Sequence, residues 1–424
     1  MSKFINFSFI VSIFLPLSQI SLGFVDLYYY YVLVIVLFPI LLFKYRTIDF
    51  GLFAVLLFLF VTGLINVSLG NNELFSFSKI YLSITIFYCF YFYIIKSKDF
   101  DLAYLFRLYF KASLVTAFIG FVQFFSYLVR FKPGYNLSWL GLRVIAPGEL
   151  GGNLLYPIHS ITSEPAAFSL LLAPAVYMSL FSFTKKELPF PISKSQAILI
   201  ISSFILTQSS TGFFALFIAL ILINFHRINF SRVLIASVTL SAVFITLYSV
   251  SIKFKDRLDS SIGLLTGEII ADAIEGGDTN GSSLILFNHF IIAKKNASDH
   301  PFGTGLGSHH VAFYKYNTLK AWFTGFGPDA TVLNINDANS LFSRILSETG
   351  YVGIFLTILF IMKYFIRSGP PYLVMINHSC LVAIFTALLR QGHYFILGLP
   401  FFILCYYYSA EFVKQNGNEK YIDQ

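Results

Sequence analysis

The stretch that decides the fold reads DHPFGTGLGSHH over Asp299–His310 and NDANSLFSRILSETGYVG over Asn336–Gly353. It gathers glycines, histidines, an arginine and a glutamate at the end of the only long polar segment of the chain. From Leu341 onward the sequence becomes apolar for long enough to enter a membrane. We therefore expect the earlier segments to form a scaffold and this stretch to carry the chemistry.

The composition of the chain is that of a polytopic membrane protein. Hydrophobic residues make up 57% of its 424 residues and charged residues only 12%, against about 25% charged residues in soluble domains. Much of the net charge of +8 lies in short loops, where it sets membrane orientation and does not indicate a nucleic-acid partner. The three cysteines lie in apolar runs and offer neither a disulfide framework nor a thiolate metal site.

Twelve apolar segments are predicted to cross the membrane, since a crossing helix needs about 20 mostly apolar residues. The seventh and eighth are short, and a hairpin of tilted or thin spans accounts for them. We expect an all-α fold with these spans: Phe4–Ile20, Leu27–Phe43, Ile48–Leu69, Ile80–Ile95, Ala112–Val129, Ala166–Phe183, Ala197–Leu206, Phe213–Phe225, Val233–Val250, Leu341–Ile366, Tyr372–Leu389 and Tyr394–Tyr408.

These spans divide the chain into five parts. Residues 1–129 hold helices 1 to 5, with an interfacial segment at Asp99–Lys111, and 130–163 form a first loop. Helices 6 to 9 occupy 164–250, a large loop occupies 251–339, and 340–424 hold helices 10 to 12 and a tail.

Lysine and arginine are distributed unequally between the two sides. The short loops at 21–26, 70–78 and 207–212 hold neither residue, whereas the alternate loops are rich in both. By the positive-inside rule both termini are then cytoplasmic, and the loops 130–163 and 251–339 are periplasmic.

Two arginines at loop–membrane junctions are candidate functional residues. Arg390 ends an apolar run and is followed closely by His393, and a charge at that depth is costly unless it faces a cavity or a partner. The alternative is an arginine that snorkels to the surface. Arg344 and Glu348 are four residues apart, close to Asn339, and share one face of a helix. The alternative there is an ordinary surface ion pair.

The first loop adds Arg143, its best cation, and His159 and Glu164 just before the sixth span. Pro165 suits the first turn of a helix, so capping is the alternative role of Glu164. Unlike Glu348, Glu164 has no arginine one turn away, and a partly buried carboxylate without a fixed cation can exchange protons near neutrality. We therefore favour Glu164 as the catalytic base or the group that orients the acceptor, and Glu348 as the residue that holds Arg344 in place. His159 and the loop around His309 and His310 are the next candidates for the base.

The glycines of Gly303–Gly307 are a weak nucleotide signature, because no strand precedes them as in a dinucleotide-binding unit. Adjacent histidines at His309 and His310 point apart on most backbones and do not indicate a metal site. We predict neither a metal nor another cofactor. What remains is a set of arginines, which suit a bidentate grip on phosphate or pyrophosphate. Arg143, Arg344 and Arg390 are expected to converge on one such site.

Several short motifs resemble bacterial O-antigen polymerases of the Wzy type. The likeness covers most of the chain by topology and is specific only in these motifs. It departs from the related O-antigen ligases, whose signature histidine corresponds to Asn339 here, and this favours a polymerase. The motifs are Ser163-Glu164-Pro165, the hairpin 207–212, the segment 301–307, Asn339-Ser340 followed by Glu348-Thr349-Gly350, and 389–392.

The resemblance implies glycosyl transfer between undecaprenyl-pyrophosphate-linked oligosaccharides at the periplasmic face of an inner membrane. Membrane lipid and a polysaccharide chain-length regulator are the other expected partners. The alternative functions are an O-antigen ligase, a polymerase of another surface polysaccharide such as capsule, and a lipid-linked oligosaccharide flippase. A plain membrane scaffold leaves the arginines unexplained. The expected catalytic residues are Glu164, Arg344 and His159, and the expected substrate-binding residues are Arg143, Arg390, Asn339, Glu348, His393 and His309.

Overall fold

The structure is a computed structural model that describes residues 2–15, 19–21, 26–140, 156–184, 188–225, 281–317 and 333–422, with isolated positions between 241 and 263. The described chain is helical apart from one antiparallel pair of three-residue strands. Its elements are α1 (Ser2–Phe14), β1 (Gln19–Ser21), β2 (Asp26–Tyr28), α2 (Tyr29–Tyr45), α3 (Phe50–Ser68), α4 (Leu74–Lys96), α5 (Leu102–Leu128), α6 (Lys132–Tyr135), the short 3-10 helix η1 (Leu137–Leu140), α7 (Pro165–Thr184), α8 (Lys194–Leu206), α9 (Ser210–Phe225), α13 (Gly281–Asp299), α14 (His309–Tyr316), α15 (Leu341–Tyr364), α16 (Pro371–Arg390) and α17 (Leu399–Ile422).

Six of the described helices are long and apolar enough to cross a membrane, so the chain is a membrane protein by helix length and composition. They are α3, α4, α5, α7, α15 and α16, and they match six of the twelve predicted spans. Four shorter apolar helices, α1, α2, α8 and α9, overlap other predicted spans. The predicted ninth span, 233–250, lies almost entirely outside the described residues.

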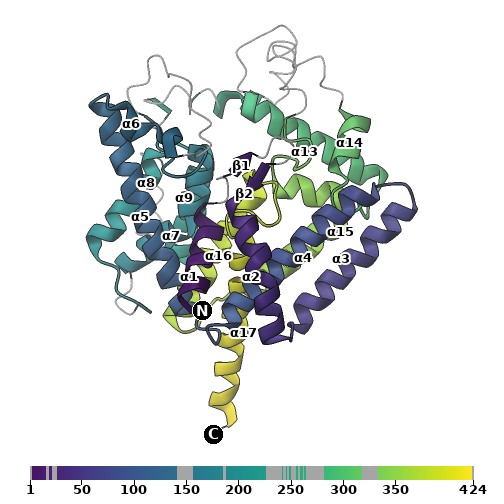
Figure 1. Ribbon diagram of the computed structural model, residues 1–424, viewed down its shortest axis with the longest axis horizontal. Helices are drawn as coiled ribbons and strands as arrows, with labels where there is room; N and C mark the ends of the chain where they lie inside the picture. The colour runs from purple at the N-terminus through teal and green to yellow at the C-terminus, as the bar shows by residue number, and fades with distance from the viewer. Residues whose placement is uncertain are drawn as a thin grey trace.

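The buried centre of the bundle is α16, which packs against α17, α7 and α9 (Figure 1). Nearly every residue of α16 from Leu373 to Ala387 is buried, in contrast to α3, which contacts α4 and is mostly exposed. Because lipid solvates apolar side chains, an exposed apolar helix such as α3 suits the lipid-facing rim.

The helices α13 and α14, which belong to the long polar segment, cover one end of the bundle (Figure 1). The C-terminus of α17 extends from the opposite end. Ala293 and Ala297, one turn apart on α13, pack on Leu346 of α15. The described part of the predicted large loop therefore includes the helices α13 and α14 and is anchored to the bundle.

Several predicted boundaries are wrong. The fourth span was predicted to begin at Ile80, and α4 begins at Leu74. The first span ends at Phe14, two residues before Pro16, because proline disfavours a helical residue ahead of it. The segment Asp99–Lys111 is no separate interfacial piece: Asp101 accepts from the Tyr104 amide at 2.8 Å and starts the continuous helix α5. The last helix begins at Leu399 and not at Tyr394, after a left-handed Gly398. By contrast, α7 begins at Pro165, as predicted.

Candidate functional site

A break in α15 at Gly350 brings the two quoted parts of the sequence together. Gly350 has φ 65° and ψ −160°, which interrupts the helix. The loop 300–308 fills the gap with its own backbone groups. The Tyr351 amide donates to the Pro301 carbonyl at 2.9 Å, and the Gly305 amide donates to the Glu348 carbonyl at 2.8 Å. The loop thus supplies hydrogen bonds that an unbroken helix would have made within itself.

Two glycines make this approach possible. A Cβ atom on Gly303 would lie 2.4 Å from the backbone carbonyl of Glu348, and one on Gly350 would lie 2.1 Å from the Pro301 oxygen. Both glycines also have a left-handed φ. The glycine-rich motif is therefore a backbone-packing device that fixes the N-terminal half of α15. We call the loop 300–308, the helix segment 337–350 and the corner 391–394 the Gly350 junction.

A buried polar network locks the loop in place. The Asn296 side-chain amide of α13 donates to the Ser347 carbonyl at 2.8 Å and to the Thr304 hydroxyl at 3.0 Å. Thr304 is 2.6 Å from the Ser308 hydroxyl. These bonds tie α13, the loop and α15 into one unit.

Arg344 and Glu348 form a fully buried ion pair inside this unit. Arg344 Nε lies 2.9 Å from Glu348 Oε1, and the side chains are only 1% and 0% exposed. The Ser340 hydroxyl accepts from the Ser343 amide and caps the helix, and the four-residue spacing of the pair on this helix places the two side chains one turn apart. The predicted pairing is thus observed, but in the protein interior and not on a surface.

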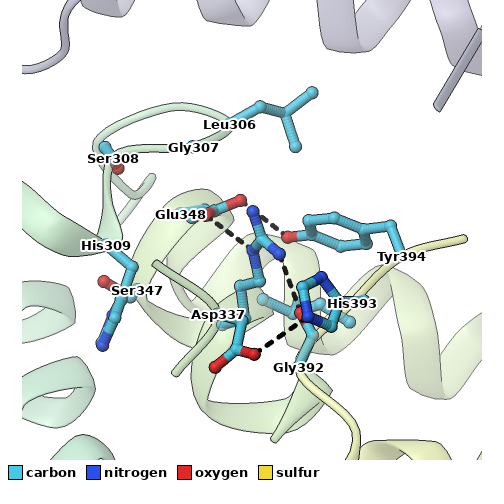
Figure 2. A network of polar contacts seen from close by, with 12 residues as sticks. Leu306, Gly307, Ser308, His309, Asp337, Ser347, Glu348, Gly392, His393 and Tyr394 are labelled. Carbon is cyan, nitrogen blue, oxygen red and sulfur yellow. Dashed lines mark hydrogen bonds and ion pairs between the residues drawn. The ribbon is translucent and has the colours of Figure 1, made fainter. Parts of the chain in front are cut away.

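The corner 391–394 completes the surroundings of this pair. Arg344 Nη1 donates to the Gly392 carbonyl at 2.8 Å, and the Tyr394 hydroxyl donates to Glu348 Oε2 at 2.8 Å. The guanidinium also lies 4.6 Å from the centre of the Tyr394 ring. Figure 2 shows Glu348 and Tyr394 facing each other. Arg344 Nη2 is buried and makes no hydrogen bond to the described residues.

A second ionisable pair lies at the same corner. His393 Nε2 is 3.1 Å from Asp337 Oδ2 (Figure 2). Burial would raise the pKa of Asp337, but the hydrogen bond and charge of His393, the Asn339 amide and Arg344 together lower this pKa to about 2. Asp337 is therefore an ionised carboxylate at neutral pH.

His309 lies beside the junction and pairs with His289 of α13. Its Nε2 is 3.0 Å from His289 Nδ1, while His289 Nε2 is 2.9 Å from the Leu333 carbonyl. The carbonyl can only accept a hydrogen bond, so His289 Nε2 is the donor to it and His289 Nδ1 is an acceptor. His309 Nε2 is therefore the donor to His289 Nδ1. Burial, His289 and Arg344 hold the pKa of His309 well below its ordinary value. His309 is thus neutral, with a buried Nδ1 that has no partner among the described residues.

The remaining predicted residues are placed differently. Asn339 is buried at the start of α15, and its side-chain nitrogen has no partner in the described chain. Arg390 Nη1 donates to the Ser282 carbonyl at 3.3 Å. Arg143 lies outside the described residues, so the expected convergence of three arginines stays a prediction.

In the first loop, His159 is buried and bonded at both ring nitrogens. Its Nδ1 is 2.9 Å from the Thr162 carbonyl, and its Nε2 is 3.4 Å from the Gln123 amide. Burial lowers the pKa of His159. Glu164 is exposed, which corrects the expectation that it is partly buried, since the helix start at Pro165 leaves this side chain outside the packed bundle. No contact of the Glu164 carboxylate with the described residues is present.

Sequence reasoning missed Asp337, Tyr394, His289 and Asn296. Asp337 and Tyr394 lie within or next to quoted motifs, but their partners are distant along the chain. Another histidine–carboxylate contact, His310 with Glu73 at 3.5 Å, joins α14 to the start of α4, and the other ring nitrogen of His310 lies 2.9 Å from the Gly307 carbonyl. In the described part of the chain, no group of three or more His, Cys, Asp or Glu side chains is arranged to hold a metal ion.

No protein-family model, curated protein or solved structure matches this chain.

Proposed function

We propose that the protein is a membrane glycosyltransferase of the O-antigen polymerase type, acting on undecaprenyl-pyrophosphate-linked oligosaccharides. The observation that carries the proposal is the Arg344 guanidinium. It is buried, held by Glu348 and the Gly392 carbonyl, and left with one nitrogen, Nη2, that has no partner among the described residues. An unsatisfied buried donor is costly unless a ligand or water pairs with it. Arginine is also the side chain best suited to phosphate oxygens.

The proposed reaction joins two repeat units. A hydroxyl oxygen of the acceptor sugar attacks the anomeric carbon of the donor. The bond between that carbon and the pyrophosphate oxygen breaks, and undecaprenyl pyrophosphate leaves with the electron pair. Negative charge therefore grows on the leaving oxygen, where a fixed guanidinium donor stabilises it most. The acceptor proton passes to a base.

The electrostatic setting supports this role for Arg344. Glu348 neutralises the buried guanidinium in the resting protein, and Tyr394 satisfies the second carboxylate oxygen. Rotating Glu348 or Tyr394 away from this arrangement is energetically costly, because the break at Gly350 and the corner at Gly392 fix the backbone next to them. A donor held this rigidly needs little reorganisation when charge develops. We propose that Arg390 and Arg143 add positive charge at the substrate and that Asn339 contacts it.

The proposal includes the orientation in the membrane. The charge distribution of the loops supports twelve spans with both termini in the cytoplasm. The Gly350 junction then lies at the periplasmic face of the inner membrane, where lipid-linked repeat units are presented. This proposed orientation, with the junction periplasmic and the C-terminus cytoplasmic, is consistent with α13 and the C-terminus lying at opposite ends of the bundle (Figure 1). A chain-length regulator is the proposed protein partner.

A deletion strain tests the function through its surface-polysaccharide banding. Loss of the ladder, with single repeat units on the lipid core, supports a polymerase. Lipid-linked polymer that fails to reach the core indicates a ligase, and repeat units trapped inside indicate a flippase. An unchanged ladder rules out all three.

Complementation of that strain tests the carrying observation. Arg344→Lys keeps the charge but offers a single ammonium in place of the planar fork, so we expect it to fail to restore the ladder. The matched control is Arg367→Lys, an exposed arginine that follows the other end of α15. We expect the control to restore the ladder fully. A full ladder with Arg344→Lys at normal membrane levels would contradict the pyrophosphate role.

A further inference from the structure

The proposed reaction needs a proton acceptor, and the Arg344–Glu348 pair cannot provide it. Glu348 Oε1 is taken by Arg344 Nε, and Glu348 Oε2 accepts from the Tyr394 hydroxyl. Both oxygens are therefore occupied in a side chain that is fully buried. The base for the acceptor hydroxyl must be another group near the same site.

His393 has the geometry of an oriented base. Its Nε2 faces Asp337 Oδ2 at 3.1 Å, and Asp337 Oδ1 is itself held by the Asn339 amide at 3.0 Å. A carboxylate accepts only, so Nε2 carries a hydrogen, and in the neutral form of the ring, which is the form that acts as a base, Nδ1 has the lone pair. Nδ1 makes no hydrogen bond to the described residues. The side chain is 37% exposed, which leaves it within reach of a substrate.

The position of His393 links it to Arg344, the proposed hydrogen-bond donor to the pyrophosphate. It stands between Gly392, whose carbonyl accepts from Arg344, and Tyr394, whose hydroxyl holds Glu348. The three consecutive residues therefore fix the guanidinium and the imidazole relative to each other (Figure 2). Gly392 also allows Asp337 to approach, because a Cβ atom there would lie 1.8 Å from the Asp337 carbonyl oxygen.

The other histidines and Glu164 fit the task less well. His309 has a free lone pair, but its ring is fully buried. Both nitrogens of His159 are already bonded. Glu164 is exposed, and no described residue orients it. His393 alone among these residues combines exposure, an orienting carboxylate and contact with the Arg344 segment.

We propose that His393 is the catalytic base of the transfer and that Asp337 is its positioning residue, an inference that rests on the proposed polymerase function. The acceptor O–H proton moves to His393 Nδ1 as the oxygen bonds to the anomeric carbon. The carbon–oxygen bond to the pyrophosphate breaks in the same step. Asp337 holds the imidazole in the required tautomer and stabilises the imidazolium that forms.

The test uses the purified full-length protein in lipid nanodiscs and lipid-linked repeat units extracted from the deletion strain. We expect His393→Gln to lower the turnover number by about 100-fold or more, the usual contribution of a general base, without raising KM. Asp337→Asn keeps the shape of the pair, but its amide can donate to Nε2 and so favour the tautomer in which Nδ1 carries the hydrogen; we expect this variant to lower turnover as well. Added imidazole is expected to restore part of the activity of His393→Ala, because the side chain is partly exposed. A merely structural histidine would not be rescued in this way.

Glu411→Gln is the control, since it removes a partly exposed carboxylate that pairs with Lys414 on α17 and has no described contact with the Gly350 junction. We expect wild-type turnover from it. If His393→Gln polymerises at the wild-type rate, or loses donor binding together with turnover, His393 is not the base, and the polymerase function still stands. If the wild-type protein makes no polymer from these units, the proposed function itself fails. The two failures are thus distinguishable.

Discussion

In the segment 156–164, His159 is buried and Glu164 is exposed, and they form no ion pair with each other. At the Gly350 junction, by contrast, the ionisable side chains pair with one another. His159 is buried with both ring nitrogens bonded, and Glu164 is exposed. At the junction, Arg344 pairs with Glu348 and Asp337 pairs with His393 around a common corner. The difference teaches that a buried charge network held on rigid backbone marks the site better than the mere presence of His and Glu in a loop.

The largest expected effect comes from breaking the Arg344–Glu348 pair. Arg344→Ala leaves Glu348 buried without its cation, which costs roughly 3–5 kcal/mol of stability. We expect low membrane levels of this variant and no polymer. The double variant Arg344→Met/Glu348→Leu removes both charges and should recover much of the stability, measured by thermal unfolding in detergent.

The double variant decides between a structural and a functional pair. If Arg344 binds the pyrophosphate, the well-folded double variant still makes no polymer. Recovery of the polysaccharide ladder together with stability would show that the pair only holds the fold.

The second prediction concerns the backbone that fixes the junction. Gly350→Ala places a Cβ atom 2.1 Å from the Pro301 carbonyl oxygen on a left-handed backbone. Gly70 has a similar φ of 73°, but nothing lies within 4 Å of its Cβ position. Gly70→Ala therefore costs about 1–2 kcal/mol from backbone strain alone. We expect Gly350→Ala to cost roughly 1–3 kcal/mol more, from overpacking.

Thermal unfolding and polymer assays of the two glycine variants provide the measurement. Loss of polymer with Gly350→Ala and not with Gly70→Ala is the expected pattern. Equal effects at both positions would mean that the loop 300–308 yields easily and does not fix α15.

The third prediction separates the two regions by pH. The pKa of His159 is lowered by burial from its ordinary value of 6.5, so the stability that its neutral form contributes is lost as pH falls below about 6.5. The pKa of Asp337 falls from 3.8 to about 2, so its contribution is present above pH 3.8 and is lost between there and about pH 2. This second contribution is roughly 2 kcal/mol.

Unfolding midpoints measured across pH in detergent test both windows. We expect His159→Gln to reduce the pH dependence of the unfolding midpoint below about pH 6.5 only. Asp337→Asn should reduce this dependence between pH 3.8 and about pH 2 only. An Asp337→Asn variant that keeps the wild-type pH dependence below pH 4 would contradict the Asp337–His393 pairing.

Local sequence signals predicted the parts of the fold that depend on local physics. The helix start at Pro165, the pairing of Arg344 with Glu348 one turn apart, and the membrane class follow from proline chemistry, helix periodicity and apolar length. The break at Gly350 could not be foreseen, because the Pro301 carbonyl that makes it possible lies 49 positions earlier.

The candidate site was predicted in part for the same reason. Arg344, Glu348 and His393 were named from their places at loop–membrane junctions. Asp337 was quoted but not chosen, because its role depends on His393, which only the tertiary fold brings near. The burial of Glu164 was predicted wrongly because position beside a span does not determine which way a side chain points.

The smallest expected effect is that of Glu164→Gln, and it bears directly on which region holds the base. Glu164 is exposed, and its carboxylate contacts none of the described residues, so the substitution leaves packing and hydrogen bonding unchanged. We expect normal membrane levels, an unchanged unfolding midpoint and a full-length polysaccharide ladder. Glu348→Gln is the matched comparison, because it makes the same change in a buried carboxylate and leaves Arg344 without its countercharge. That variant should lose the ladder. A well-folded Glu164→Gln protein that makes no polymer would instead return the base to the segment 156–164, and the role proposed for His393 would then be wrong.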